Sequence, residues 1–542
     1  MYKRIHCRRL FKVQMILILL LTALLFRVSY FQLFKRSYYK NLADKQYYYQ
    51  EKISDFKYQL LDTKGKYLNT TNEKYAVVLD IRLFKLNNYE SKLNDIMALN
   101  YIIKGNDEKF DINEVLNKDS GKVYVDINES SFIKIQDVIK DLKGVYTWRY
   151  DTIDRNDSWN IVNVINNMYN WNNEKKDENS IESFINTITG ENIKPEIKFQ
   201  VDKSGFIKEA GYNVPEKGNV VLTLDNELQD SIKKVLNSDK FNKFQQIGVV
   251  LIESNTGKVK AFTQKNDKLP NVNIAASLQG YPPGSTFKLI TAELALEKGI
   301  VSKDNKYICA GKYCKKNNKP HAHGSINIEQ AINYSCNDFF IELGNKINAE
   351  EIINYAKKQG YSSKVLGFYD EAAGIINKPE KVELNNNLIL GYSLSATPIQ
   401  VAGAISPILN EGNYVKPYII EKIKDSNDNT IKEFQGTVER VMSKNTAEDM
   451  KYFMRSTVTK GTGSIANING MEVGGKTGTA SSLDGEVFHT HGWFAGYYKK
   501  DNKYYTLVVF VPNIDGKNEL GEEYQGSNTA GVVFKDILLT IK

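Results

Sequence analysis

The sequence has 542 residues, of which 42% are hydrophobic and 25% are charged, and this composition is typical of a globular protein with about three domains. Its formal net charge is +8, but the 72 lysine and arginine residues are scattered among 64 acidic residues. The sequence has no concentrated basic stripe, so the charge pattern argues against nucleic-acid binding and predicts no nucleic-acid partner.

The N-terminus holds one long apolar segment. Residues 13–34 contain the run MILILLLTALLF and stay mostly apolar, which is enough for one tilted membrane helix of about twenty residues. No A-x-A cleavage site follows, so we expect an uncleaved signal anchor rather than a removed signal peptide. Basic residues stand both before and after the segment, so positive charge alone does not orient the anchor.

Residues 35–215 form a polar region that is rich in Asn and Lys. Short strand-like pieces such as YAVVLDI (75–81) occur in it, but no group of catalytic residues does. We predict an α+β pedestal of a spacer-like or dimerisation-like kind.

A different pattern occupies residues 216–542. NVVLTLDNELQDSIKKVL (219–236) predicts a strand followed by an amphipathic helix, and QIGVVLIE (246–253) and VKAFTQ (259–264) predict two more strands. The C-terminal part predicts further apolar strands and a closing helix, TAGVVFKDILLTI. Strands at both ends with a helical middle indicate one antiparallel sheet that is assembled from distant segments and covered by helices.

One short motif suggests nucleotide binding. GMEVGGKT (470–477) satisfies the G-x-x-x-x-G-K-[ST] pattern of a phosphate-binding loop. Such a loop needs a helix whose N-terminal N–H groups face the phosphate, but the next residues, GTASSLDGEVFHTHGWFAGYY, predict a turn and a strand. We therefore expect no nucleotide partner.

A candidate nucleophile lies in YPPGSTFKLITAELALEKG (281–299), which predicts a helix whose first turn contains Ser285. Lys288 lies three residues later and hence on the same helix face. A serine hydroxyl needs an adjacent base, and a desolvated lysine can be neutral and accept its proton. S-x-x-K alone is common in solvated helix starts, so this pair needs support from elsewhere in the chain.

That support comes from two further motifs. SINIEQAINYSCNDFF (325–340) contains Ser335 and Asn337, and VGGKTGTAS (473–481) contains K-T-G. The order S-x-x-K, S-x-N, K-T-G is the signature of serine penicillin-recognising enzymes. Together with SLSATPIQVAGAIS and TKGTGSIA, these stretches make residues 216–542 resemble the class B penicillin-binding proteins.

The resemblance implies a penicillin-binding, serine-β-lactamase-like fold of α+β class and a role for each motif residue. Ser285 would be the acylated nucleophile, Lys288 its general base and Ser335 a proton relay. Asn337 would bind the substrate amide, Lys476 and Thr477 would bind the terminal carboxylate, and Gly478 would let the substrate approach closely. The N–H groups of Ser285 and Thr479 would form the oxyanion hole. No cofactor is required for this chemistry.

The resemblance also implies a function and a location. The E-D-x-x-F element of bifunctional relatives is missing from residues 35–215, so we expect a monofunctional D,D-transpeptidase that cross-links peptidoglycan stem peptides and binds β-lactams. Action on the wall places residues 1–12 in the cytoplasm and the bulk outside the cell membrane. The implied partner is a membrane glycan polymerase of the shape, elongation, division and sporulation family. Residues 53–71 lack the arginines of the usual R-G-x-I-x-D-R-x-G motif.

Two alternative functions share some of these motifs. Class D β-lactamases use S-T-F-K and K-T-G, but they usually carry S-x-V and need about half this length. A penicillin-binding sensor or scaffold would be acylated without turning over. Turnover of a stem-peptide analogue separates these functions.

Three of the four cysteines lie close together in the sequence. Cys309, Cys314 and Cys336 fall within 28 residues, together with His321 and His323. Three thiolates and one imidazole are a typical ligand set for a closed, tetrahedral structural Zn²⁺ site. The spacing predicts such a site from Cys309, Cys314, His323 and Cys336, with His321 as the alternative imidazole ligand.

Two other interpretations of these cysteines remain open. Outside the membrane, Cys309 and Cys314 could form a disulfide, or all three thiols could be free and buried as small hydrophobic groups. The fourth cysteine, Cys7, precedes the anchor. His489 and His491 form a second H-x-H pattern on one face of a predicted strand and are weaker candidates.

Overall fold

The computed structural model describes residues 2–542 except 56–57, 69–70, 89–91, 154–157, 171–172, 190–193, 214–217, 277, 317–318, 426 and 485. The chain divides into two compact units. The N-terminal unit contains residues 1–55, 72–152 and 193–215, and the C-terminal unit contains residues 56–71, 153–192 and 216–542.

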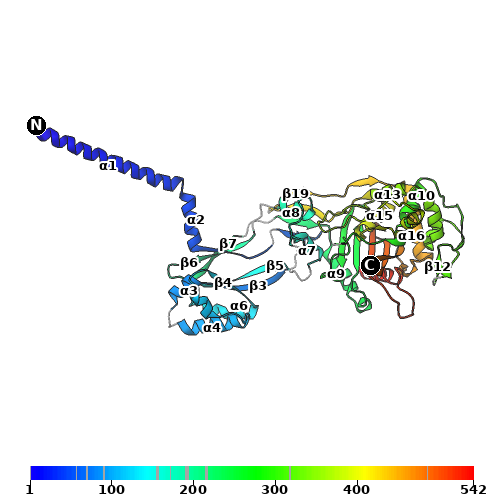
Figure 1. The fold of residues 1–542 in the computed structure, drawn as a ribbon, viewed down its shortest axis with the longest axis horizontal. Coiled ribbons are helices and arrows are strands. Elements are labelled where there is room, and N and C mark those ends of the chain that lie inside the picture. The colour runs from blue at the N-terminus through cyan, green and yellow to red at the C-terminus, as the bar shows by residue number, and fades with distance from the viewer. Residues whose placement is uncertain are drawn as a thin grey trace. The chain divides into compact units, whose positions relative to one another are not determined.

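The N-terminal unit begins with one long helix, α1 (Tyr2–Leu33), which is blue in Figure 1. Its segment Arg9–Leu33 is long and apolar enough to cross a membrane. None of the most apolar 18-residue stretch of this segment is buried against the rest of the protein. The structure therefore confirms the predicted apolar helix, which the sequence placed at residues 13–34. α2 (Arg36–Tyr47) follows.

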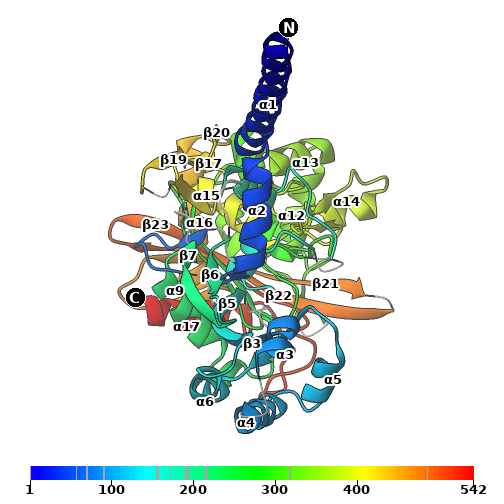
Figure 2. The same cartoon turned by 90° about the vertical axis from the view of Figure 1, so that its left-hand side faces the viewer.

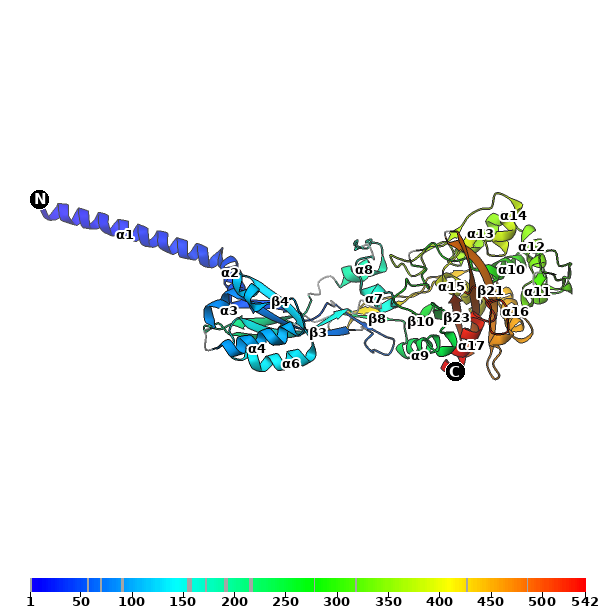
Figure 3. The ribbon, with the colours of Figure 1, turned by 60° about the horizontal axis from the view of Figure 1, so that its bottom comes forward.

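The rest of the N-terminal unit is α+β, as the sequence predicted, with two three-stranded sheets of order β1-β6-β7 and β4-β3-β5. The strands are β1 (Tyr48–Lys52), β3 (Thr71–Asp80), β4 (Lys122–Ile127), β5 (Val145–Ile153), β6 (Glu196–Val201) and β7 (Ile207–Asn213). The helices are α3 (Ile81–Asn87), α4 (Leu93–Lys104), α5 (Ile112–Asn117) and α6 (Glu129–Ile139). α4 and α6 pack against β3 and β4, where Leu99, Ile103 and Ile135 are fully buried (Figure 3).

The centre of the C-terminal unit is a five-stranded antiparallel sheet of order β10-β9-β23-β22-β21. Its strands are β9 (Gly248–Glu253), β10 (Lys258–Gln264), β21 (Val473–Asp484), β22 (Val487–Lys500) and β23 (Lys503–Val511). The first two strands and the last three are more than two hundred residues apart in the chain. This arrangement confirms the predicted antiparallel sheet built from distant segments, and Figure 2 shows the paired β21 and β22.

Helices and short strands surround this sheet. The helices are α7 (Ile161–Asn166), α8 (Ile181–Ile188), α9 (Asn226–Leu236), α10 (Lys288–Glu297), α11 (Ile328–Asn333), α12 (Asn337–Asn345), α13 (Ala349–Lys358), α14 (Val382–Ile389), α15 (Pro398–Leu409), α16 (Lys444–Lys460) and α17 (Ala530–Ile541), with 3₁₀ turns η2 (Asp239–Phe241), η3 (Gly284–Thr286) and η4 (Ser464–Ala466). The other strands are β2 (Gln59–Leu61), β8 (Asn219–Leu222), β11 (Tyr307–Cys309), β12 (Lys315–Lys316), β13 (Lys319–Pro320), β14 (Gly324–Ile326), β15 (Ile375–Ile376), β16 (Leu394–Ser395), β17 (Asn413–Val415), β18 (Ile420–Lys424), β19 (Thr430–Glu433) and β20 (Val438–Arg440).

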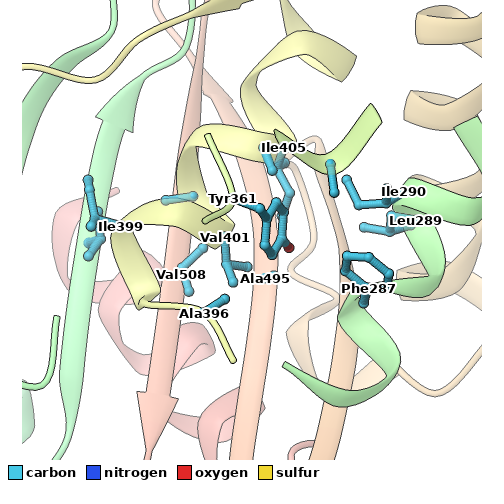
Figure 4. Packing of buried hydrophobic residues seen from close by; sticks show 14 of the residues in the cluster. Phe287, Leu289, Ile290, Tyr361, Ala396, Ile399, Val401, Ile405, Ala495 and Val508 are labelled. Carbon is cyan, nitrogen blue, oxygen red and sulfur yellow. The ribbon is translucent and has the colours of Figure 1, made fainter. Parts of the chain in front are cut away.

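Both faces of the central sheet are covered by helices. Successive residues of a strand point to opposite faces, so neighbouring residues belong to different hydrophobic clusters. In β23, Val508 packs with the cluster that includes α10 and α15, whereas Val509 packs with the cluster that includes α9 and α17. Figure 4 shows the first cluster, in which Val401 of α15 lies near Val508 and Ala495 of the sheet. This packing holds the start of α10 against the sheet.

The structure corrects the predicted domain boundary at residue 215. Residues 56–71 and 153–192, which the sequence analysis assigned to the pedestal, belong to the C-terminal unit. The reason is that β2 pairs in parallel with β8, and that α7 and α8 bury Ile165 and Ile185 in the core of that unit. A buried ion pair adds to this, because Lys176 Nζ lies 2.7 Å from Glu182 Oε1 with both side chains at most 2% exposed.

Candidate active site

The three predicted motifs meet at one cleft of about 960 Å³ in the C-terminal unit. The predicted residues that line it are Ser285, Ser335, Asn337, Thr477 and Thr479. Other lining residues come from β21, β22 and the segment 514–527. We call this space the Ser285 cleft.

Ser285 lies in the 3₁₀ turn η3, which leads into α10, rather than in the first turn of the α-helix as the sequence predicted. The preceding Gly284 has φ of +53°, and a Cβ there would lie 2.7 Å from the carbonyl oxygen of Thr479. Only glycine fits this approach, so η3 packs directly against β21. The Ser285 hydroxyl forms no hydrogen bond within the described part of the chain and is half-buried in the cleft.

Lys288 is fully buried behind the cleft. Its Nζ lies 2.9 Å from the carbonyl oxygen of Ser335, 3.3 Å from Ser335 Oγ and 2.6 Å from Asn337 Oδ1. Burial lowers the pKa of Lys288 to about 8, because desolvation disfavours the ammonium form. A neutral amine that donates its two hydrogens to the two carbonyl oxygens keeps a free lone pair, so this geometry suits a base.

Ser335 connects α11 to α12 in a left-handed conformation, with φ of 55°. A non-glycine residue in this region costs on the order of 1–3 kcal/mol and needs support from its surroundings. The support comes from the C-terminal cap of α11, in which Ser335 N–H donates to Ile332 O and Cys336 N–H donates to Ala331 O. Both buried lysines add to it, since Lys476 Nζ donates to Ser335 Oγ over 2.9 Å and Lys288 contacts the same residue. The strained turn thus points the Ser335 hydroxyl at two amines.

The K-T-G motif lies on β21, which is an edge strand of the sheet, as the sequence predicted. Lys476 is fully buried, and desolvation, followed by the charge of Lys288, holds its pKa well below the usual value. A Cβ on Gly478 would lie 2.8 Å from the carbonyl oxygen of Pro283, so the close approach of η3 requires glycine there. β21 continues to Asp484 and pairs with β22, so the residues after K-T-G form the predicted strand rather than the helix that a phosphate-binding loop needs.

The structure brings together the four predicted metal ligands. The ligand atoms of Cys309, Cys314, His323 and Cys336 all lie within 4.8 Å of one another, and we call them the Cys3His cluster. Cys309 Sγ lies 3.3 Å from His323 Nδ1, and Cys314 Sγ lies 3.6 Å from Cys336 Sγ. All three thiols are free, so the alternative Cys309–Cys314 disulfide is not formed. His321 is not among the clustered ligands.

Asp338 organises the loop that follows Cys309 and carries Cys314, and the sequence analysis missed it. Its buried carboxylate accepts backbone hydrogen bonds from Gly311, Lys312, Tyr313 and Cys314. Burial would raise the pKa of Asp338, but hydrogen bonds from Tyr313 and Lys312 outweigh it and hold the pKa below its usual value. The donors lie 24 to 27 residues earlier, so no local pattern marks this residue.

The second H-x-H pair does not form a ligand set. His489 Nδ1 lies 2.8 Å from Asp515 Oδ2, whereas His491 Nε2 lies 2.7 Å from Ser482 Oγ. Burial lowers the pKa of His491 to about 4. Neither histidine belongs to a metal-ligand cluster within the described residues.

Comparison with known proteins agrees with this site. The family model of the penicillin binding protein transpeptidase domain matches residues 247–539, which is more than half of the chain. The chain is 28% identical over 359 residues to stage V sporulation protein D of Bacillus subtilis, covering 60% of this chain and 55% of that protein. It is 26% identical over 387 residues to peptidoglycan D,D-transpeptidase FtsI of Buchnera aphidicola, covering 67% of this chain and 64% of that protein.

A solved structure shows the same fold. A peptidoglycan synthetase from Bifidobacterium adolescentis superposes with a TM-score of 0.63 at 18% identity, covering 91% of this chain and 96% of that one. Taken with the family match, these findings show that the chain belongs to the penicillin binding protein transpeptidase family, as the class B resemblance predicted.

Proposed function

We propose that the protein is a peptidoglycan D,D-transpeptidase that cross-links stem peptides through an acyl-enzyme on Ser285, and that β-lactams acylate the same residue. The observation that carries the proposal is the convergence of Lys288 and Lys476 on Ser335, beside the cleft that Ser285 lines. A relative that is named a peptidoglycan D,D-transpeptidase supports the reaction class.

In the first step, the Ser285 oxygen attacks the carbonyl carbon of the penultimate D-alanine, and Lys288 accepts the hydroxyl proton. With a pKa of about 8, about one Lys288 amine in ten is neutral at pH 7. As the bond to the terminal D-alanine breaks, Ser335 relays a proton to the leaving amine. The contact of Ser335 Oγ with Lys288 and Lys476 supports this role.

The transition state of this step carries negative charge on the former carbonyl oxygen. The N–H groups of Ser285 and Thr479 would stabilise that oxygen, and the tight packing of η3 on β21 supports their proximity. Asn337 would hold the substrate amide, while Lys476 and Thr477 would bind the terminal carboxylate. In the second step an acceptor amine attacks the ester carbon, loses its proton to Lys288, and the proton returns to the Ser285 oxygen as the ester bond breaks.

Labelling of the full-length protein in detergent with fluorescent penicillin tests the proposed nucleophile. We expect a stable adduct that Ser285→Ala abolishes, while Ser302→Ala, which removes an exposed hydroxyl elsewhere, leaves labelling unchanged. Lys288→Ala should abolish acylation because the proton has no acceptor. Labelling that persists in Ser285→Ala would reject the assignment.

Peptide turnover by the same preparation separates the proposed function from its alternatives. Transfer of a stem-peptide analogue to an amine acceptor is the expected result. Rapid release of hydrolysed penicillin would instead identify a β-lactamase. A stable penicillin adduct without any peptide transfer would identify a sensor or scaffold.

We also propose that the Cys3His cluster binds a structural Zn²⁺ ion. Support comes from the close approach of the four ligand atoms, from the burial of the three thiols and from the absence of disulfides among these described cysteines. Three thiolates and one imidazole suit zinc in a closed site, and such an ion stabilises the fold that holds it. When bound, the ion would tie residues 309–323 to the first turn of α12.

Elemental analysis of untagged full-length protein tests the zinc proposal. We expect one zinc per chain and a lower melting temperature after chelation, because a ligand that binds only the folded state stabilises it. Cys309→Ser should lose both the metal and the chelator effect, while Cys7→Ser, which changes the remaining cysteine, should keep both. Substoichiometric zinc, or melting that ignores the chelator, would refute a structural metal.

Finally, we propose that α1 is a single-pass anchor, with residues 1–12 in the cytoplasm, the bulk outside the cell and a membrane glycan polymerase as partner. The apolar segment Arg9–Leu33 supports the anchor. The wall substrate of the proposed reaction supports the orientation. Protease added to wall-stripped cells should digest both units. Full protection would show the reverse topology.

A further inference from the structure

The loop that the Cys3His cluster closes also contributes to the Ser285 cleft. We call residues 310–323, between β11 and β14, the Cys loop. Within it, β12 and β13 form a small hairpin in which Lys315 pairs with Pro320. Lys315 is exposed and lines the cleft. Among the described residues of the Cys loop, no other lines it.

The base of this hairpin is fixed to the reaction centre. Asn337 Nδ2 donates to the carbonyl oxygen of Tyr313 over 3.1 Å, and Asn337 Oδ1 accepts from Lys288. Asp338 binds the next N–H group, that of Cys314, and Cys314 O accepts from the N–H of His321 over 2.9 Å. Lys315 therefore directly follows Cys314, whose backbone is held by hydrogen bonds. The backbone of Lys315 is fixed in this way, while its four-carbon side chain stays flexible.

Lys315 is also a cation of the cleft without an ion-paired carboxylate in the described part of the chain. Asp515 is engaged by His489 and by the N–H of Thr490, whereas Lys517 and Glu523 lie opposite each other in an isolated backbone bridge. In the part of the chain that the structure describes, no carboxylate forms an ion pair with the Lys315 amine.

We propose that Lys315 binds a carboxylate on the substrate peptide, other than the terminal one, and thereby favours stem peptides that carry an acid over those that carry an amide at that position. This inference rests on the proposed transpeptidase function. The carboxylate could belong to the donor peptide, which acylates Ser285, or to the acceptor peptide, which accepts the acyl group. Both carry the same chemistry, and the two steps can be measured separately.

The test uses full-length protein and matched peptides that differ only in one carboxylate or carboxamide. In the donor arm, the rate of acyl-enzyme formation is measured; in the acceptor arm, the rate of acyl transfer to the peptide amine. We expect Lys315→Gln to lower kcat/KM for the acidic peptide about two- to five-fold in one arm, as for an exposed ion pair, and to leave the amide peptide unchanged. Lys315→Arg should retain the preference, and added salt should weaken it.

Lys319→Gln is the matched control, since Lys319 is an exposed lysine on the other strand of the same hairpin and does not line the cleft. An effect in the donor arm assigns the carboxylate to the donor peptide, and an effect in the acceptor arm to the acceptor. If the ratio of kcat/KM for the acidic and the amide peptide is the same in wild type and in Lys315→Gln, in both arms, the inference is overturned while the transpeptidase function stays intact. Failure of wild type to form any acyl-enzyme would instead remove the proposed function, and this inference with it.

Discussion

Replacing Asp338 with asparagine tests how the Cys loop is held. Each carboxylate oxygen accepts two backbone hydrogen bonds: Oδ1 from Tyr313 and Cys314, and Oδ2 from Gly311 and Lys312. An asparagine side chain has only one oxygen, so either orientation of its amide turns an NH₂ group toward two N–H donors. The substitution preserves size and shape, so its effect comes from these hydrogen bonds and from the lost charge.

The size of the effect follows from the bonds that are lost. A hydrogen bond to a charged group contributes about 1.5–3 kcal/mol, so two of them amount to roughly 3–6 kcal/mol. Part of this is recovered because the exposed side of the loop can relax. We expect Asp338→Asn to lower the free energy of unfolding of the C-terminal unit by about 3 kcal/mol. The Cys3His cluster should also bind zinc more weakly, because Cys314 loses its fixed backbone.

The assay is thermal unfolding of the full-length protein with and without chelator, combined with zinc competition. Asp536→Asn is the control, since that carboxylate pairs with Lys240 at the surface and is 25% exposed. Its effect should stay within about 0.5 kcal/mol. The reasoning is refuted if Asp338→Asn melts like Asp536→Asn and keeps wild-type zinc affinity.

Three further predictions follow from buried groups in the C-terminal unit. Because the pKa of Lys288 is about 8 and the neutral amine is the base, the rate constant of acylation by penicillin should rise with pH through about 8 and level off above it; a flat profile from pH 7 to 9 would contradict this. Gly478→Ala places a Cβ 2.8 Å from the carbonyl oxygen of Pro283, so it should slow acylation by penicillin at least tenfold in the same labelling assay. A wild-type rate in this variant would show that η3 need not approach β21 so closely. Lys176→Met leaves Glu182 and Asp370 without their shared cation and should destabilise the unit by about 3–5 kcal/mol in denaturant unfolding. A double variant that also carries Glu182→Leu should recover only part of the loss, because Asp370 and the N–H of Tyr369 stay without their partners.

Much of the site could be predicted from the sequence because its chemistry is carried by short motifs. Ser285, Ser335 and Lys476 are each recognisable within a few residues, and their order along the chain was enough to expect one cleft. The sheet was predictable for a related reason, since alternation such as that of Val508 and Val509 is a local property of the strand.

What the sequence could not reveal depends on long-range contacts. The pairing of β2 with β8 joins residues more than 150 positions apart, so a boundary drawn from composition at residue 215 missed it. Asp338 acts on backbone groups, which have no sequence signature. The left-handed turn at Ser335 was equally hidden, because serine ordinarily avoids the conformation that this helix cap requires, and contacts with distant amines accompany its backbone hydrogen bonds.

The shared contact of Lys288 and Lys476 with Ser335 has a thermodynamic consequence for ligand binding. In the free protein, desolvation and the neighbouring amine both disfavour a charged Lys476. An anionic ligand beside this amine would raise its proton affinity again, so binding at a pH where the free amine is neutral would draw a proton from the buffer. The measured heat of binding would then vary with the ionisation enthalpy of the buffer, and the apparent affinity for anionic ligands would fall as the solution becomes more alkaline.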